Sequence, residues 1–151
     1  MISIERALPG TISEEIVRQF LREASAAYPE AVGEPDMVDW PIKLASRADC
    51  FCLRRKDGSL AAALFAYLND TQSHIGFIPF ICALPECEKG AAYRLHEAYK
   101  DQARELGMCT LRLEVVKSNV HAYRFYLRQG YVVVEDRVER NRLLMELVLG
   151  D

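Results

Sequence analysis

No run of apolar residues in this sequence is long enough to cross a bilayer, and the first ten residues, MISIERALPG, lack the apolar core of a secretion signal. Neither sign of charge dominates, because the formal net charge is -3, which gives no overall attraction for nucleic acid or an anionic membrane. Low-complexity segments and repeats of solenoid length are also missing. We therefore expect a cytoplasmic protein that binds neither nucleic acid nor membranes.

Patterns typical of metal sites and hydrolases are missing as well. No Ser-His-Asp set, paired-carboxylate hydrolase pattern or P-loop can be found. The five cysteines are an odd number, and they lie at Cys50, Cys52, Cys82, Cys87 and Cys109. The first two share one face of an expected strand, but no second Cys/His pair follows at a zinc spacing. The sequence therefore predicts reduced thiols, packed as small side chains, and no metal.

The composition that remains is that of a globular protein. Half of the 151 residues are hydrophobic and 27% are charged, so we expect one domain with one core, residues 1–151. Hydrophobic periodicity and turn residues predict strands and helices in the order β-α-α-β-β-β-α-β-α-β-β. The expected strands are 2–8, 50–55, 60–68, 74–84, 109–116, 131–139 and 142–149. The expected helices run from Thr11 or Ser13 to Ala27 and over 36–48, 90–106 and 118–130, with a loop at 29–35.

This order predicts a mixed α/β sheet with helices on its faces. The helix 90–106 connects strand 74–84 to strand 109–116, and such a connection is a right-handed parallel crossover. The strands on either side form antiparallel hairpins, one of them turning at Asp57-Gly58. Pro79 cannot donate a hydrogen bond within strand 74–84, so a bulge or a locally unpaired stretch is expected there.

The segment SNVHAYRFYLRQGY (118–131) concentrates the functional information. Asn119 begins the helix and can cap it or present its amide outward, while Gly130 ends it. Ala122 and Tyr126 follow Asn119 on the same helical face, and the small alanine leaves room for a thin ligand. Phe125 points toward the core. Capping explains the two ends of the helix, but it does not explain this aligned Asn, Ala and Tyr face.

The segment resembles the motif N-x-x-A-x-x-hydrophobic-Y-x-x-x-G-[FY] of the Gcn5-related N-acetyltransferase (GNAT) family. The matching residues are Asn119, Ala122, Phe125, Tyr126, Gly130 and Tyr131, and the preceding strand LRLEV (111–115) and the order of elements over the whole chain also agree. The resemblance implies the acyl-CoA N-acyltransferase fold, a central mixed sheet flanked by about four helices. It also implies acetyl-CoA as co-substrate and direct transfer of acetyl to a primary amine.

The family's phosphate loop, [QR]-x-x-G-x-[GA] before a helix, corresponds here to Cys87–Ala92. Gly90 and Ala92 fit the pattern, whereas Cys87 replaces the usual Gln or Arg. The neighbouring carboxylates of Glu86 and Glu88 add negative charge beside a pyrophosphate site. Backbone N–H groups at a helix N-terminus still form an anion site, so the contacts expected for the loop are Cys87, Lys89, Gly90, Ala91 and Ala92.

The resemblance also assigns roles around the thioester. The backbone of the strand near Pro79 would contact acetyl-CoA and supply the oxyanion donor, through Ile81, Cys82, Ala83 and Leu84. Tyr126 would protonate the departing thiolate, or else serve only as a packing tyrosine. Glu114 lies where the ribosomal-protein N-terminal acetyltransferases, which the segment 111–131 is similar to, have a proposed base. The alternative for Glu114 is an ion-paired residue of an alternating strand, paired for example with Arg112.

The acceptor side of the site is less defined. Trp40 and Asp39 lie in the segment that walls the acceptor site in this fold, although Trp40 could instead anchor its helix. His74, His96 and His121 are expected on surfaces or helix faces rather than as bases. The expected partner is a small-molecule or peptide amine, and the chain would be a monomer or a homodimer. The alternative function is a catalytically inactive CoA-binding or protein-interaction module with the same fold.

Overall fold

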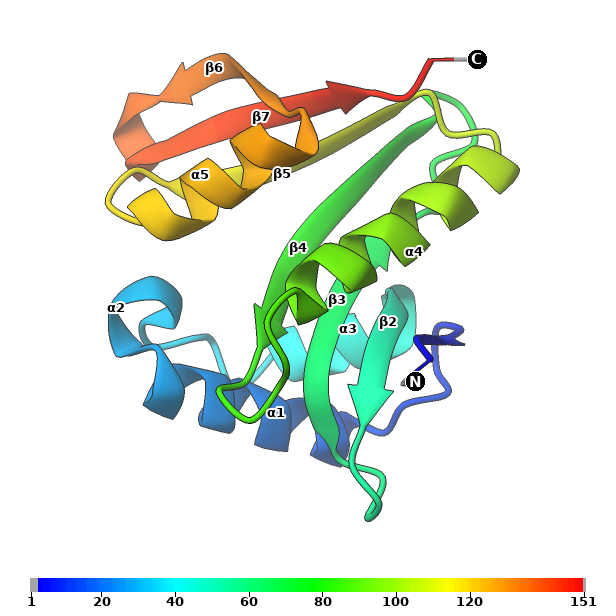
Figure 1. The fold of residues 1–151 in the computed structure, drawn as a ribbon, viewed down its shortest axis with the longest axis vertical. Coiled ribbons are helices and arrows are strands. Elements are labelled where there is room, and N and C mark those ends of the chain that lie inside the picture. Colours follow the sequence, from blue (N-terminus) through cyan, green and yellow to red (C-terminus); the bar gives the residue numbers. More distant parts are fainter. Residues whose placement is uncertain (1–2, 151) are drawn as a thin grey trace.

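The computed structural model describes residues 3–150, and within them the mixed α/β architecture is confirmed (Figure 1). The strands are β1 (Glu5–Ala7), β2 (Asp49–Arg54), β3 (Leu60–Tyr67), β4 (Ile75–Ala83), β5 (Thr110–Val116), β6 (Val132–Arg137) and β7 (Arg142–Val148). The helices are α1 (Glu14–Ala27), α2 (Pro29–Val32), α3 (Trp40–Arg47), α4 (Ala91–Glu105) and α5 (Val120–Gln129), and a 3-10 helix covers Val138–Arg140.

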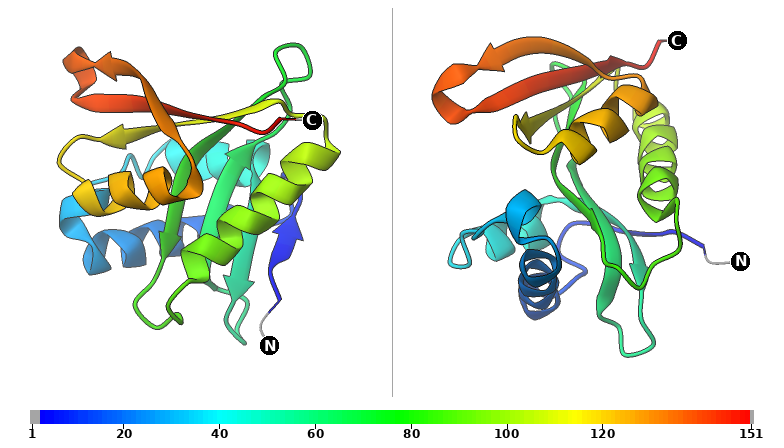
Figure 2. Two further views of the ribbon diagram at one scale, coloured as in Figure 1. Left: turned by 45° about the horizontal axis from the view of Figure 1, so that its top comes forward. Right: turned by 60° about the vertical axis from the view of Figure 1, so that its left-hand side comes forward.

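All seven strands form one sheet in the order β1-β2-β3-β4-β5-β7-β6. β4 and β5 are parallel and are connected through α4, while every other neighbouring pair is antiparallel. Figure 2 shows the sheet between α4 on one side and the N-terminal helices on the other. The predicted crossover and hairpins are therefore confirmed.

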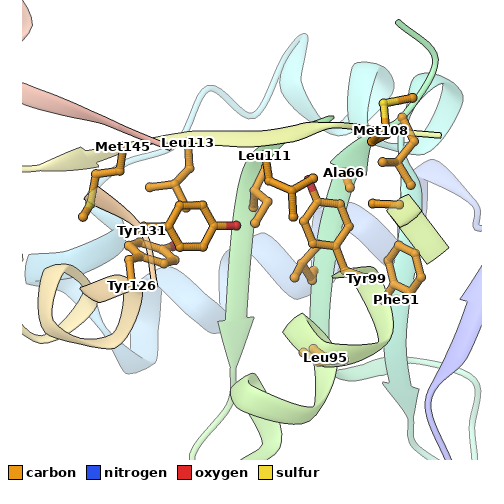
Figure 3. Close-up of a cluster of buried hydrophobic side chains, with 14 of the residues drawn as sticks. Phe51, Ala66, Leu95, Tyr99, Met108, Leu111, Leu113, Tyr126, Tyr131 and Met145 are labelled. Carbon is orange, nitrogen blue, oxygen red and sulfur yellow. The ribbon is translucent and has the colours of Figure 1, made fainter. Parts of the chain in front are cut away.

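Two clusters of buried side chains hold these layers together. On one face of the sheet, Leu95 and Tyr99 of α4 pack with Leu111 of β5 (Figure 3). Tyr126 of α5 and Tyr131, which follows the C-cap of that helix, belong to the same cluster. On the other face, the apolar side of α1 packs with α3 against β2 and β3. Strand β3 is buried along nearly its whole length because it lies between both layers.

Several element boundaries differ from the sequence prediction, and in the described part of the expected strand 2–8 only Glu5–Ala7 forms a strand. The expected loop 29–35 contains the short helix α2, which starts at Pro29, a residue tolerated in a first helical turn. The expected helix 36–48 begins only at Trp40, because the Asp36 side chain accepts hydrogen bonds from the N–H groups of Val38 and Asp39 and forms a turn instead. The expected strand 131–139 ends at Arg137, before the 3-10 helix; in the expected strand 2–8, residue 2 lies outside the described residues.

A bulge interrupts β4 at the predicted proline. Phe65 of β3 pairs with Phe80, and Tyr67 pairs with Phe77, so the single residue Ala66 faces both Ile78 and Pro79. Pairing of β4 with β5 stops at Ile78, opposite Leu113. Beyond that point the two parallel strands diverge, as Figure 1 shows. The bulge predicted from Pro79 is confirmed, and it coincides with the place where the sheet opens.

Candidate active site

A cleft of about 670 Å³ lies where β4 and β5 separate. This volume is within the usual range for small-molecule sites. The predicted site residues that line it are Trp40, Asp39, Ile81, Cys82, Ala83, Ala92, Glu114, Asn119, Ala122 and Tyr126. Residues from the N-terminal helices, the central strands and α5 thus meet at one place in the tertiary structure.

The backbone of β4 offers hydrogen-bonding groups to this cleft. The N–H of Leu84 donates to the carbonyl of Ala61 in β3. The carbonyl of Ala83 points to the opposite side of β4 and accepts from the hydroxyl of Tyr28 at 2.9 Å. Because backbone groups alternate between the two edges of a strand, the N–H groups of Ile81 and Ala83 point toward the side that β5 has left. Tyr28 had no sequence signal that marked it as part of the site.

The remaining predicted contacts of acetyl-CoA, one at the end of β4 and four in the phosphate loop, do not line the cleft. Leu84 is buried in the cluster beneath α1, and the thiol of Cys87 donates to the carbonyl of Ala61 at 3.2 Å. Lys89 and Gly90 are exposed, and Ala91 is buried as the first residue of α4. These residues lie beyond the cleft, along the loop between β4 and α4 and at the start of α4.

Gly90 sets the geometry of that helix start. Its φ of 89° lies in the left-handed region, and no atom lies within 4 Å of the position where a Cβ would stand. The N-cap residue supplies no side-chain hydrogen bond to the first turn of α4. The N–H of Ala91 donates to the carbonyl of Glu88 at 3.2 Å, so the amides that follow Ala91 in the first turn of α4 are the ones that can face an anion.

The negative charge of Glu86, which is not part of the family's loop pattern, is compensated by an arginine. Arg55, at the end of the β2–β3 hairpin, forms ion pairs with Glu86 at 2.5 Å and with Glu23 of α1 at 2.9 Å. Hydrogen bonding to Arg55 lowers the pKa of the Glu86 carboxyl below its usual value. Glu88 and Lys89 are both exposed. Glu86 is therefore part of an ion-pair cluster with Arg55 and Glu23 and is not an isolated charge.

The motif residues of α5 take up distinct tasks. Asn119 caps the helix, because its side-chain oxygen accepts from the N–H of Ala122 at 3.2 Å. Tyr126 is 7% exposed, and its ring lies between those of Phe125 and Tyr131, with centroids at 5.6 and 5.7 Å. Burial raises the pKa of the Tyr126 hydroxyl above its usual value, so the group stays protonated and can act as a donor.

Glu114 lines the cleft and is ion-paired at the same time. Its side chain is 13% exposed and accepts from Arg137 and from Arg140, the latter at 3.2 Å. The suggested pairing with Arg112 is wrong, since Arg112 donates to Glu146 at 2.7 Å. The register in which β7 pairs with β5 on one side and with β6 on the other brings these arginines to Glu114. Sequence spacing does not reveal this register.

The far wall of the cleft combines an aromatic surface with charges. Trp40 is half-buried and packs edge-on against Phe80 of β4, with ring centroids 5.3 Å apart. Trp40 therefore packs α3 against β4 and also lines the cleft, and its contact with an acceptor stays a prediction. Asp39 is exposed beside it. Glu34 and Lys43, which the sequence did not mark as site residues, also line the cleft, as does Arg142, which pairs with Val116 on the β5 side.

The three histidines occupy surface or helix-face positions, as the sequence predicts. His96 lies on the face of α4 that packs into the core and is fully buried. His74 is exposed, and His121 is exposed at the start of α5, where it lines the cleft. Within residues 3–150 no three His, Cys, Asp or Glu side chains gather as metal ligands. None of the helices in the described part of the chain is long and apolar enough to span a membrane.

The model of the acetyltransferase (GNAT) family matches residues 16–131. The chain belongs to this family. A comparison with curated proteins gives no match. Solved structures give the same fold: an acetyltransferase of the GNAT family from Staphylococcus aureus Mu50 is 12% identical, with a TM-score of 0.74 over 97% of this chain and 99% of that one.

Two further GNAT-like structures resemble this chain. The ribosomal-protein-S18-alanine N-acetyltransferase from Escherichia coli is 19% identical, with a TM-score of 0.70 over 100% of this chain and 96% of that one. N-acetylglutamate synthase from Neisseria gonorrhoeae, solved with coenzyme A and N-acetyl-glutamate, is 16% identical, with a TM-score of 0.71 over 100% of this chain and 36% of that one. At these identities the likeness establishes the fold.

Proposed function

We propose that this GNAT protein is an acetyl-CoA-dependent N-acetyltransferase that transfers acetyl directly to a primary amine. The observation that carries the proposal is the opening between β4 and β5 beyond Ile78 and Leu113, with the buried Tyr126 hydroxyl on one wall. An opened pair of parallel strands offers unpaired backbone groups to an extended, amide-containing ligand such as the pantetheine arm of CoA.

The residues present fit acetyl-CoA along this path. The N–H groups of Ile81 and Ala83 point toward the gap and would bind the pantetheine amides or the thioester oxygen. Ala122 keeps the facing side of α5 thin enough for the arm to pass. The amides that follow Ala91 at the start of α4 would hold the pyrophosphate, with the exposed Lys89 adding positive charge.

The transfer then needs three groups from the protein. A backbone N–H of β4 near Ile81 stabilises the oxyanion as the amine nitrogen bonds to the thioester carbon. A water held by Glu114 accepts the proton that the amine loses, since direct protonation of Glu114 would give up its contacts with Arg137 and Arg140. As the C–S bond breaks, the Tyr126 hydroxyl donates its proton to the CoA sulfur and is reprotonated from solvent.

The acceptor would occupy the wall formed by Trp40 and the exposed carboxylates. Asp39, together with Glu34 and Asp36, would attract a cationic amine, and the face of Trp40 would contact its apolar or charged part. The substrate class proposed is therefore a small molecule or peptide with a primary amine, and cationic amines are the first to test.

The first experiment is calorimetric titration with acetyl-CoA, with CoA and a nucleotide without pantetheine as controls. Saturable micromolar binding of acetyl-CoA and none of the nucleotide is expected. A panel of amines is then screened for thiol release by the wild type and by Tyr126→Phe, which we expect to lose about 100-fold or more in rate. A folded protein that does not bind acetyl-CoA would overturn the proposal.

The second candidate is a CoA-binding or interaction module without turnover. The observation that favours it is the phosphate loop, where the Cys87 thiol is hydrogen-bonded to Ala61 and Glu88 stands exposed. Tight acetyl-CoA binding without thiol release toward any amine of the panel would favour this module over the enzyme.

A further inference from the structure

His96 is an unusual side chain for the place that it occupies. It is 0% exposed on the core side of α4, and its ring makes edge contacts with those of Tyr99, Phe125 and Tyr131 at centroid distances of 5.4 to 6.4 Å. Its Nδ1 atom is buried and has no hydrogen-bond partner within the described residues. A buried polar atom without a partner costs stability, so an apolar side chain would pack here at lower cost.

The one polar contact of His96 is directed at Tyr131. The Nε2 atom lies 2.8 Å from the Tyr131 hydroxyl oxygen. The contact is a hydrogen bond in either tautomer of the neutral ring, since Nε2 can donate to the hydroxyl oxygen or accept from the Tyr131 O–H. Burial lowers the pKa of His96 to about 4, so the ring is neutral near neutral pH.

Tyr131 is in turn coupled to the tyrosine of the candidate site. Its N–H donates to the carbonyl of Tyr126 at 3.1 Å, and the two rings pack with centroids 5.7 Å apart at 67°. Figure 3 shows the two rings side by side between α5 and the sheet. Tyr131 is 1% exposed, and its hydrogen bond to His96 adds a directional contact at the hydroxyl end of a ring that is otherwise held by packing.

We infer that His96 is a positioning residue, which holds Tyr131 against Tyr126 and thereby sets where the Tyr126 hydroxyl meets the CoA sulfur. The inference rests on the proposed function, because it takes Tyr126 as the group that contacts the sulfur. His96 also lies on the helix that begins at Gly90. The loop proposed for the pyrophosphate and the tyrosine proposed for the thiol are therefore tied to one rigid element.

The test compares the binding of CoA and of desulfo-CoA, which lacks the thiol, by calorimetry at one pH. A hydrogen bond from Tyr126 to the thiolate makes wild type prefer CoA by about tenfold or more. We expect His96→Phe and Tyr131→Phe each to reduce this preference to about threefold or less, with unchanged affinity for desulfo-CoA. His96→Gln, whose amide can replace Nε2 as donor or acceptor, should retain the preference.

The matched control is Tyr99→Phe, which removes a buried hydroxyl that has no hydrogen-bond partner within the described residues and leaves the contact between His96 and Tyr131 in place. It should keep the preference for CoA. If His96→Phe does not fold, Tyr131→Phe carries the test alone. A preference that persists in Tyr131→Phe, or that is lost equally in His96→Gln or Tyr99→Phe, would overturn the inference.

Tyr126→Phe separates the two proposals. Loss of the CoA preference in this variant supports the role of Tyr126, and persistence in the His96 and Tyr131 variants would then refute only the positioning role. A preference unchanged in Tyr126→Phe, or missing from wild type, would refute the proposed contact between Tyr126 and the sulfur itself.

Discussion

Replacing Glu114 by Gln separates a catalytic from a structural role for this residue. Glutamine keeps the size and one side-chain oxygen but removes the charge that Arg137 and Arg140 contact. Arg137 retains Glu135 at 2.8 Å, and Arg140, with 63% of its side chain exposed, can be hydrated, so no buried charge loses all its partners. The expected loss is therefore about 1–2 kcal/mol, below the ~3–5 kcal/mol typical of breaking a fully buried pair.

This loss corresponds to a fall of about 3–6 °C in Tm for a chain of this size. If Glu114 orders the water that takes the amine proton, kcat should fall by about 100-fold or more at saturating acetyl-CoA. Thermal unfolding gives the first quantity. Continuous detection of released CoA thiol, with an amine found in the panel, gives the second.

The matched control is Glu146→Gln. Glu146 of β7 pairs with Arg112 of β5, the strand that carries Glu114, at 2.7 Å; its side chain is 20% exposed, and it does not line the cleft. We expect its Tm to fall by a similar amount and its kcat to change little. Wild-type kcat in Glu114→Gln would refute the catalytic role, and an equal loss of rate in Glu146→Gln would show that loosening the strand pair alone lowers the activity.

Three further outcomes follow from the contacts described. Ala122→Phe should fill the passage beside α5 and weaken acetyl-CoA binding by about 100-fold with little change in Tm; binding at wild-type affinity in calorimetry would place the ligand elsewhere. Arg55→Met should weaken acetyl-CoA binding about 3–10-fold by leaving Glu86 uncompensated, and Glu86→Gln in the same chain should restore it; no recovery would contradict the electrostatic explanation. The pKa of His96 in the folded protein is about 4, below the ordinary 6.5. The free energy of unfolding therefore includes a contribution of about 2–4 kcal/mol above pH 6.5, where the buried ring is neutral. This contribution is lost as the pH falls to 4. Urea unfolding at pH 7.5 and 4.5 should show less acid destabilisation in His96→Gln than in wild type, and equal losses would refute the assignment.

Features that depend on a few neighbouring residues could be read from the sequence. Asn119 and Gly130 mark the ends of α5 because capping and a left-handed φ are local properties. Pro79 marks the bulge in β4 because it has no N–H to donate. The alternation of strands and helices likewise predicted the mixed sheet and the parallel crossover. The family resemblance carried by the α5 motif also predicted part of the cleft lining, including Asn119, Ala122 and Tyr126.

The tertiary structure alone decided how distant charges and polar groups pair. Glu114 meets Arg137 and Arg140 only through the register of three strands, and Arg55 meets Glu86 and Glu23 only because a hairpin end packs beside a loop and a helix. Such pairings depend on where whole elements lie.

The core position of His96 was hidden for the same reason. One turn of α4 presents several residues near the edge of its apolar face, and only the packing of α5 and Tyr131 decides which of them is buried. Local sequence thus determined most of the elements, the ends of α5 and the motif. The choice of partners for Glu114, Arg55 and His96 required the assembled fold, because contacts between residues far apart in the chain follow from the joint packing of several elements.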